Sequence, residues 1–226
     1  MRSTQSFFRT ILFTGLAAIT GAVSQGQTSV AASLYGAFSP STSGNGTTQS
    51  PSNAAGALLE LRHIRNPLVG YEFTYAYNRG NQAYSENLPS GCGLVCAQTG
   101  SASIPANAHQ ISADWVVSLK AANLRPFVLA GGGVLLNVPG AGTVTAVTCP
   151  VEGLTPCTTS SVPTSISAKG VFVYGAGLDW TLLPHLGLRL QYRGNLYKAS
   201  ALANAFSSTN AFTHSAEPMI GVFFRL

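Results

Sequence analysis

Val69–Arg79 reads VGYEFTYAYNR, and this stretch decides the fold. From residue 69 to residue 77 its odd positions carry valine, phenylalanine and three tyrosines. Its even positions carry glycine, glutamate, threonine, alanine and asparagine. Because successive side chains of a strand point to opposite faces, one face is wholly apolar and the other is polar or small. The pattern predicts a β-strand that separates two very different environments.

The same alternation recurs along most of the chain. Leu186–Lys198 places leucines and a tyrosine on one face, and arginines, a glutamine and an asparagine on the other. No segment shows convincing helical periodicity. We therefore expect eight strands, near residues 28–38, 54–65, 69–79, 107–120, 124–135, 167–180, 186–198 and 213–226.

The connections between these segments alternate in length. Short turns near 66–67, 121–123 and 183–184 alternate with long polar loops near 40–53, 80–106, 136–166 and 199–212. Strict alternation puts all the long loops at one end of an up-and-down barrel, as in outer-membrane barrels. The sequence therefore predicts an eight-stranded antiparallel up-and-down transmembrane β-barrel.

Charge distinguishes a membrane barrel from a soluble one. Only 8% of the residues are charged, against roughly 25% in a typical soluble domain. No run of about 20 apolar residues predicts a spanning helix in the mature chain. Most charged strand residues fall on the polar face, where a narrow lumen would make them pair. The expected lumen network comprises Glu60, Arg62, Glu72, Asp114, Lys120, Arg125, Lys169, Asp179, Arg189, Arg193, Glu217 and Arg225.

Aromatic residues recur near strand ends on the apolar face, where girdles meet the membrane interface. The expected interfacial aromatics are Tyr71, Tyr77, Trp115, Tyr174, Trp180 and Tyr192. These positions predict membrane lipid as a partner of the outer face. The cations are scattered, so no nucleic-acid partner is expected.

Gly175–Tyr197, GAGLDWTLLPHLGLRLQYRGNLY, resembles the penultimate hairpin of small outer-membrane barrels of the OmpA-like and OmpX/opacity-like type. The resemblance concerns the barrel domain only. It implies a location in the outer membrane of a Gram-negative bacterium and a C-terminal strand read by the barrel-assembly machinery. Leu226 departs from the terminal aromatic residue that is usual in that family.

The N-terminus has the three parts of a secretory signal. Arg2 and Arg9 form a positive region, Thr10–Val23 is apolar, and small residues precede Ser24. We expect a signal peptide over residues 1–27, cleaved after Ser24 or within 25–27, and a barrel over residues 28–226. A retained membrane anchor is the alternative, for which the apolar run is short.

Four cysteines lie in two of the long loops, at Cys92, Cys96, Cys149 and Cys157. Export would place them in an oxidising compartment, so disulfides are expected, most simply one within each loop. Four cysteines allow three pairings, and a cross-loop arrangement stays open. A metal site is the alternative, although no histidine ligand lies near Cys92 and Cys96.

No catalytic constellation is visible. His214 and Ser215 are adjacent on a strand and so point to opposite faces. Ala130–Gly133 lacks the lysine and helix of a phosphate loop. We expect no catalytic residue, metal or cofactor, and a non-enzymatic structural or surface-interaction role through the long loops, with no ligand identified. A small-solute pore and an outer-membrane lipid-modifying enzyme are the alternatives.

Overall fold

The computed structural model describes residues 26–65, 68–87, 99–140, 144–149, 158–204 and 206–226. The expected signal segment, apart from its last residues, lies outside this part of the chain. Within the described residues, no helix is long and apolar enough to cross a membrane.

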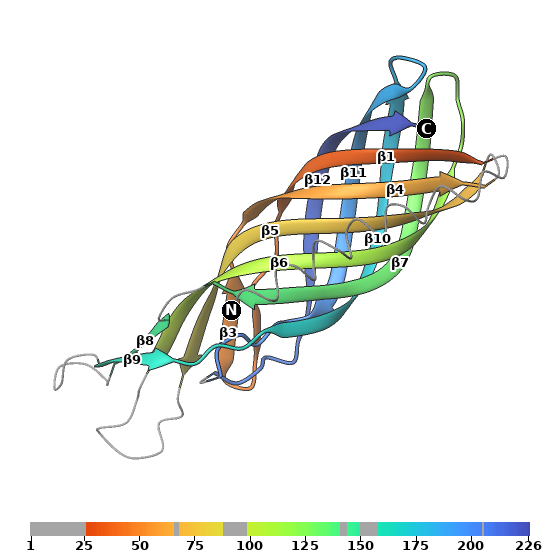
Figure 1. Cartoon of the computed structure of the whole chain (residues 1–226). Coiled ribbons are helices and arrows are strands. Elements are labelled where there is room, and N and C mark those ends of the chain that lie inside the picture. The colour runs from red at the N-terminus through yellow and green to blue at the C-terminus, as the bar shows by residue number, and fades with distance from the viewer. Residues whose placement is uncertain (1–25, 66–67, 88–98, 141–143, 150–157, 205) are drawn as a thin grey trace, which may run out of the picture.

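Eight long strands of the described chain form a closed antiparallel barrel (Figure 1). Each pairs with the next long strand in sequence, and β1 pairs with β12 to close the sheet. The predicted eight-stranded antiparallel up-and-down barrel is therefore confirmed. The barrel strands are β1 (Gln27–Ala37), β4 (Ala54–Ile64), β5 (Val69–Asn87), β6 (Thr99–Ser118), β7 (Leu124–Pro139), β10 (Ser167–Thr181), β11 (Leu186–Lys198) and β12 (Phe212–Arg225).

The two ends of the barrel differ as the loop lengths predict. The C-terminus and the connections β4–β5, β6–β7 and β10–β11 lie at one end, the short-turn end (Figure 1). The remaining connections lie at the other, the long-loop end. Closure pairs the backbone of every barrel strand on both sides, which a hydrocarbon environment requires.

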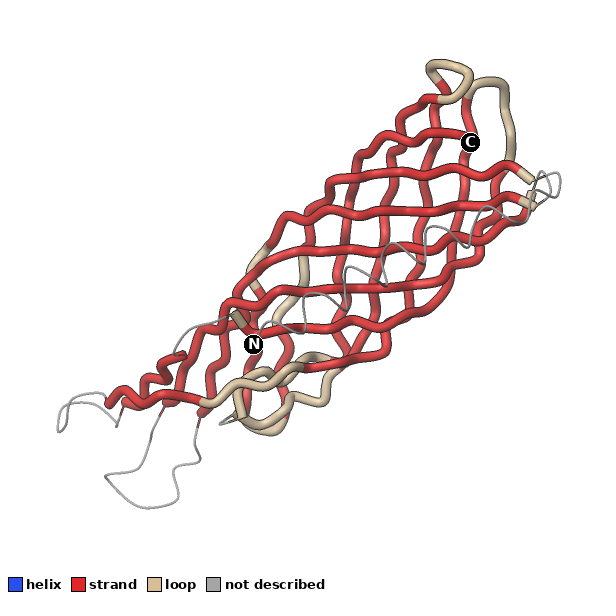
Figure 2. The backbone as a smooth tube through the Cα atoms, viewed as in Figure 1, coloured by secondary structure: helices blue, strands red, loops and turns tan. Residues whose placement is uncertain are grey.

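Strands extend farther at the long-loop end than the sequence predicts. β5 and β6 stay paired from Val69 opposite Val117 to Asn87 opposite Thr99. Four short strands also lie where loops are expected: β2 (Thr42–Gly44), β3 (Thr47–Pro51), β8 (Val144–Cys149) and β9 (Thr158–Val162). β3 pairs with β5, and β8 pairs with β6. The result is a sheet that projects beyond the barrel (Figure 2).

Side-chain burial along the barrel strands alternates with period two, and the sense of the alternation is inverted relative to a soluble barrel. In β6 the outward Trp115 is 69% exposed, whereas the inward Val116 is fully buried. In β11 the outward Leu190 is 53% exposed, whereas Arg189 is fully buried. Apolar side chains thus cover the outside, and charged side chains fill the inside.

Candidate functional site

The lumen is closed near its middle by a cluster of buried ion pairs, here called the plug. Its three guanidinium groups come from β4 and β11, and its carboxylates come from β4, β5, β6 and β10. All seven side chains are inward-facing and no more than 5% exposed. The plug consists of Arg62, Arg189, Arg193, Glu60, Glu72, Asp114 and Asp179.

Arg189 makes the most extensive contacts in the plug. Its Nε and Nη2 donate to the two carboxylate oxygens of Asp179 at 2.7 and 2.9 Å, a bidentate geometry. Its Nη1 lies 3.2 Å from Glu60 Oε2 and 3.6 Å from Glu72 Oε2. One arginine therefore joins carboxylates from three different strands.

Glu72 links all three arginines. Arg62 Nε donates to Glu72 Oε2 at 2.6 Å, and Arg62 Nη1 donates to Asp179 Oδ2 at 3.2 Å. Arg193 lies 3.6 Å from the other Glu72 oxygen, and its Nη2 donates to Asp114 Oδ2 at 3.0 Å. The plug thus spans β4, β5, β6, β10 and β11 and crosses the lumen.

Two phenylalanines seal the plug on its short-turn side. The guanidinium carbon of Arg62 lies 3.9 Å from the ring centroid of Phe127, and that of Arg189 lies 5.4 Å from the same ring. Arg189 also lies 5.6 Å from the ring of Phe223. Cation–π contacts of this kind strengthen where water is excluded, so these rings both fill space and favour the charged arginines.

The structure brings only part of the expected network into the plug. Arg125 and Arg225 are half-buried at the short-turn end, where they donate to the neutral oxygens Gln27 Oε1 and Thr181 Oγ1. Lys120 lies just beyond the end of β6 and is exposed, because the strand has already left the lumen there. Lys169 is inward but only half-buried, and within the described residues it makes no ion pair.

Glu217 also stands apart from the plug. It lies directly opposite Arg193 in the β11–β12 pairing, yet the Arg193 guanidinium turns toward Glu72 and Asp114 instead. Ser215 Oγ donates a hydrogen bond to Glu217 Oε1 at 3.3 Å. Among the described residues it makes no ion pair, although it is only 5% exposed.

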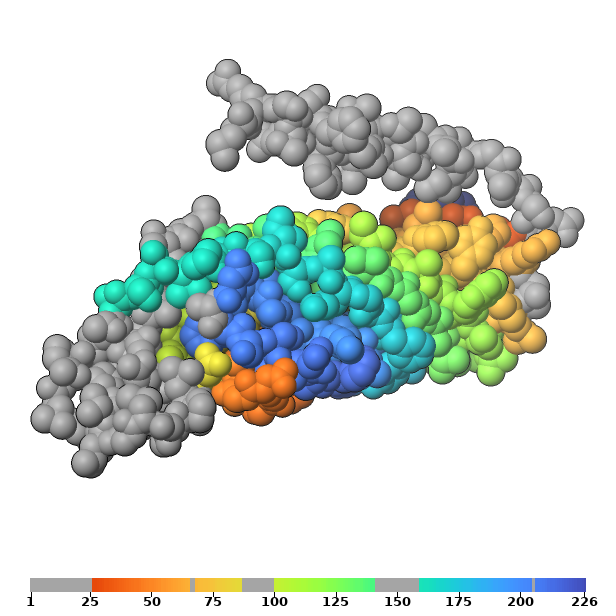
Figure 3. Space-filling model, turned by 90° about the horizontal axis from the view of Figure 1, so that it is seen from below, coloured from red at the N-terminus to blue at the C-terminus, as the bar shows by residue number. Residues whose placement is uncertain are grey.

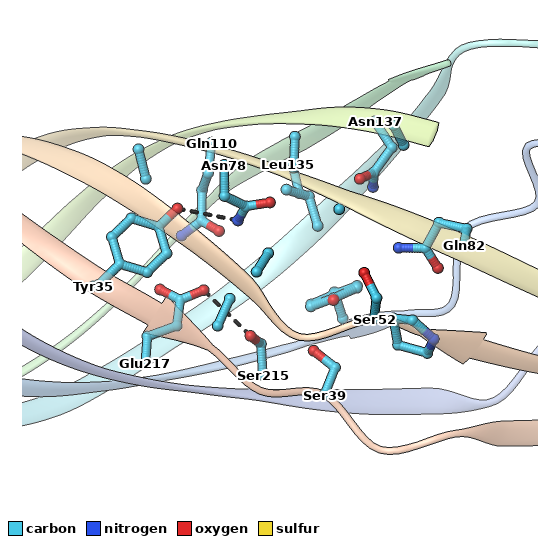
Figure 4. Close-up of a pocket in the computed structure, with 18 residues that line it drawn as sticks. Tyr35, Ser39, Ser52, Asn78, Gln82, Gln110, Leu135, Asn137, Ser215 and Glu217 are labelled. Carbon is cyan, nitrogen blue, oxygen red and sulfur yellow. Dashed lines mark hydrogen bonds between the residues drawn. The ribbon is translucent and has the colours of Figure 1, made fainter. Parts of the chain in front are cut away.

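Glu217 lines a polar cavity on the long-loop side of the plug, here called the chamber (Figure 4). The chamber has a volume of about 50 Å³. Tyr35, Asn78 and Gln110 surround the same end of it, and Asn78 Nδ2 donates to the Tyr35 hydroxyl at 3.1 Å. A polar cavity of this size has room for a few water molecules or a small ion.

A third layer, here called the cap, closes the long-loop end. Residues 199–204 and 206–211 fold over the mouth, and Leu202, Ala203 and Phe206 pack against inward side chains of β5 and β6. Figure 3 shows this segment between the β2–β3 hairpin and the chain that follows β9. Thr209 contacts the hairpin, and residue 203 bridges to Thr164.

Tyr84 holds the cap in place. Its hydroxyl donates to the carbonyl oxygen of Ser200 at 2.7 Å and accepts from the amide of Leu202 at 3.1 Å. The outward residues of β5 beyond Tyr77 are polar or small, so Tyr84 lies outside the apolar belt. Burial raises the pKa of Tyr84 to about 12, because the ionised form loses its hydration.

The expected interfacial aromatics all lie on the outer face and are 38–69% exposed. Tyr71 and Trp115 are directly paired near the short-turn end. Tyr174 Oη lies 2.8 Å from His214 Nε2, and Tyr75 Oη lies 2.9 Å from His109 Nδ1, farther toward the long-loop end. Polar tips on apolar rings are suited to a membrane interface.

The described residues include one of the four cysteines. Cys92, Cys96 and Cys157 lie outside the described residues, and the backbone of Cys149 ends β8. The disulfides stay a prediction. Among the described residues no group of three or more His, Cys, Asp and Glu side chains could hold a metal ion.

Comparison with known proteins identifies the fold. No protein-family model matches the sequence, and no curated protein matches it. OprG from Pseudomonas aeruginosa, an outer-membrane protein, is 12% identical with a TM-score of 0.52, covering 89% of this chain and 96% of OprG. Ail of Yersinia pestis and neisserial surface protein A are each 15% identical, with TM-scores of 0.47 and 0.46, covering 90% of this chain and all of theirs. The architecture is that of small outer-membrane barrels of the OmpA and OmpX type.

Proposed function

We propose that this chain is a non-enzymatic outer-membrane protein of a Gram-negative bacterium, whose closed barrel carries a folded surface for interactions outside the cell. The observation that carries the proposal is the filled lumen. The plug crosses its middle, and the cap closes its long-loop end. A barrel blocked at two levels is a scaffold rather than a channel.

The outer face supports the membrane location. Its apolar side chains extend along β11 and β12 from Leu186 and Phe224 to Leu196 and His214. That span is about ten residues of tilted strand, which matches a transmembrane strand. Lipid is therefore the partner of the outer face. Export through a signal peptide and insertion by the barrel-assembly machinery remain parts of this proposal.

The long-loop end supports a surface role. It is a paired structure of β2, β3, β8, β9 and the ends of β5 and β6. Its described residues are mostly Ser, Thr, Gly, Asn and Ala. The cap anchors this sheet to the barrel through Tyr84 and Phe206. A rigid platform loses less entropy on binding than a flexible loop does, which suits it to recognition.

The two alternatives find less support. A pore requires a continuous lumen, which the plug interrupts with side chains that are almost fully buried. For a lipid-modifying enzyme, His214 and Ser215 would have to act together. Ser215 faces the lumen and His214 faces outward against Tyr174, so they lie on opposite sides of the wall.

Single-channel recording in a planar bilayer tests the proposal. We expect the purified barrel to give no stable open level. An Arg62→Ala, Glu72→Ala double variant, which removes side chains from the middle of the plug, is expected to give measurable openings. The matched control is Lys120→Ala at the exposed turn, expected to stay closed like the parent. A stable open conductance in the parent protein would overturn the closed-barrel proposal.

A further inference from the structure

The buried lumen carries more negative than positive groups. Five carboxylates but only three guanidinium groups lie there at 5% exposure or less, which leaves two carboxylates in excess. At the short-turn end the excess is opposed by Arg125, which lies directly across from Asp179. At the long-loop side of the plug Glu217 lies directly across from Arg193, but the Arg193 guanidinium pairs with Glu72 and Asp114 and makes no ion pair with Glu217. A buried carboxylate without an ion pair is costly, and proteins pair or neutralise it.

The chamber beside Glu217 presents acceptor atoms. Three side-chain amides that line the chamber donate hydrogen bonds through their nitrogen atoms to other side chains of the barrel. Asn78 donates to the Tyr35 hydroxyl, Gln110 to Asn195 Oδ1, and Asn137 to Ser200 Oγ. Their carbonyl oxygens accept no hydrogen bond from the described residues. Gln110 and Asn137 are 6% and 5% exposed, so these are buried acceptors along one cavity. Figure 4 shows Asn78, Gln110 and Glu217 gathered at its inner end.

One carboxylate and neutral amide oxygens are the ligands of a hard cation. The single formal negative charge favours a monovalent ion, since divalent sites use more carboxylates. A volume of about 50 Å³ accommodates an alkali ion with some of its waters. The oxygen donors and the absence of a His/Cys cluster among the described residues argue against a transition metal.

We propose that the chamber binds a monovalent alkali cation, held by the Glu217 carboxylate and the carbonyl oxygens of Asn78 and Gln110. The ion completes the charge balance on the long-loop side of the plug. It would stabilise the folded barrel in proportion to its occupancy. The inference concerns the lumen and does not depend on the role of the surface platform.

The first test compares thermal unfolding of the folded barrel in detergent in NaCl, KCl and choline chloride at equal ionic strength and pH. Choline carries its charge on a quaternary ammonium, which carboxylate and carbonyl oxygens cannot coordinate as they coordinate a hard cation. We expect a higher Tm in Na⁺ or K⁺ than in choline, with a saturable dependence on cation concentration. Glu217→Gln should abolish the difference, and Gln110→Met should shift its midpoint to higher concentration. The matched control is Glu86→Gln, on the half-exposed end of β5, which should retain it.

A second measurement locates the ion. Crystals grown with Tl⁺ should show an anomalous peak within the chamber beside Glu217, and the peak should be absent in Glu217→Gln. The competing solution to the charge imbalance is a proton on Glu217. An infrared carboxylic-acid band that Glu217→Gln removes, together with no Tl⁺ peak, would overturn the proposal. A cation-dependent Tm that Glu217→Gln leaves unchanged would overturn it as well.

Discussion

Arg189→Ala is the most informative single change in the plug. Arg189 is fully buried and approaches three carboxylates, Asp179, Glu60 and Glu72. Removing its guanidinium leaves Glu60 without an ion pair among the described residues and leaves Asp179 with Arg62 alone. It also opens a void between Phe127 and Phe223, whose rings lie 5.4 and 5.6 Å from the Arg189 guanidinium carbon.

The magnitude follows from the burial. Breaking a buried ion pair by removing one partner costs about 3–5 kcal/mol, because the remaining charge stays buried. Arg189→Ala should therefore destabilise the barrel by about 3–5 kcal/mol. Adding Glu60→Gln should recover part of this loss, since it removes the carboxylate charge left without an ion pair, and the double-mutant cycle measures the coupling.

The assay is equilibrium unfolding by urea in lipid vesicles, followed by tryptophan fluorescence. Trp115 and Trp180 are 69% and 50% exposed on the lipid-facing side, so their emission reports insertion. Lys120→Ala is the matched control and should change the free energy of unfolding by less than about 0.5 kcal/mol. If Arg189→Ala cost less than about 1 kcal/mol, the plug would not be a network of buried charges, and the reasoning would fail.

Three further predictions concern the cap and the strand packing. Tyr84→Phe should weaken the cap by about 1–3 kcal/mol, because Ser200 O and Leu202 N lose their hydrogen-bond partner in a buried site. Hydrogen exchange at the Leu202 amide measures this loss of stability, and unchanged protection would contradict the role of Tyr84. The pKa of Tyr84 is raised from 10.0 to about 12, so the cap stability it contributes is fully present below pH 10 and is lost as the pH rises through about 12. The protection factor of the Leu202 amide, which divides out the base catalysis of exchange itself, should fall over that range in the parent and stay constant in Tyr84→Phe. Gly131→Ala should destabilise the barrel by about 1–3 kcal/mol, since its Cβ would collide with Ala113 O and Asp114. Gly132→Ala should be nearly neutral, because the nearest neighbour of its Cβ is 3.5 Å away. Equal effects of the two changes on urea unfolding would refute the predicted packing of β6 on β7.

The barrel was predictable because two signals coincide. Alternation along strands such as Val69–Arg79 separates the faces, and the loop lengths order the strands. Both signals are local, so they can be recognised in the sequence without knowledge of tertiary contacts. The inward positions of Arg62, Arg189 and Arg193 follow from the same alternation, since a two-residue period fixes the face of each residue.

The long-loop end was less predictable, for a physical reason. Beyond Arg79 both faces of β5 are polar or small apart from Tyr84, so the sequence carries no alternation that marks a strand. Pairing there depends on backbone hydrogen bonds to β3 and β6 and on burial of Tyr84 under the cap. Leu202 and Phe206 lie in a segment without strand periodicity, and only the fold brings them over the lumen.

The sequence also did not predict which charged side chains would pair with one another. Alternation fixes the face of a side chain but not its depth or its direction along the lumen. Glu217 and Arg193 are directly opposite each other, yet the arginine turns toward the plug and Glu217 borders the chamber. Lys120 shares the parity of the lumen residues of β6 but lies past the strand end.

The central claim is that the apolar face contacts lipid while the charged face fills the lumen, and NMR of the protein in lipid nanodiscs tests it directly. Nuclear Overhauser effects between lipid acyl-chain protons and side-chain methyl groups report which residues touch lipid. The structure predicts such contacts for Leu190, Ile220 and Val222, which are 50–55% exposed, and none for Val116 and Val173, which are fully buried. Water contacts instead of lipid contacts at the first three residues would contradict the account.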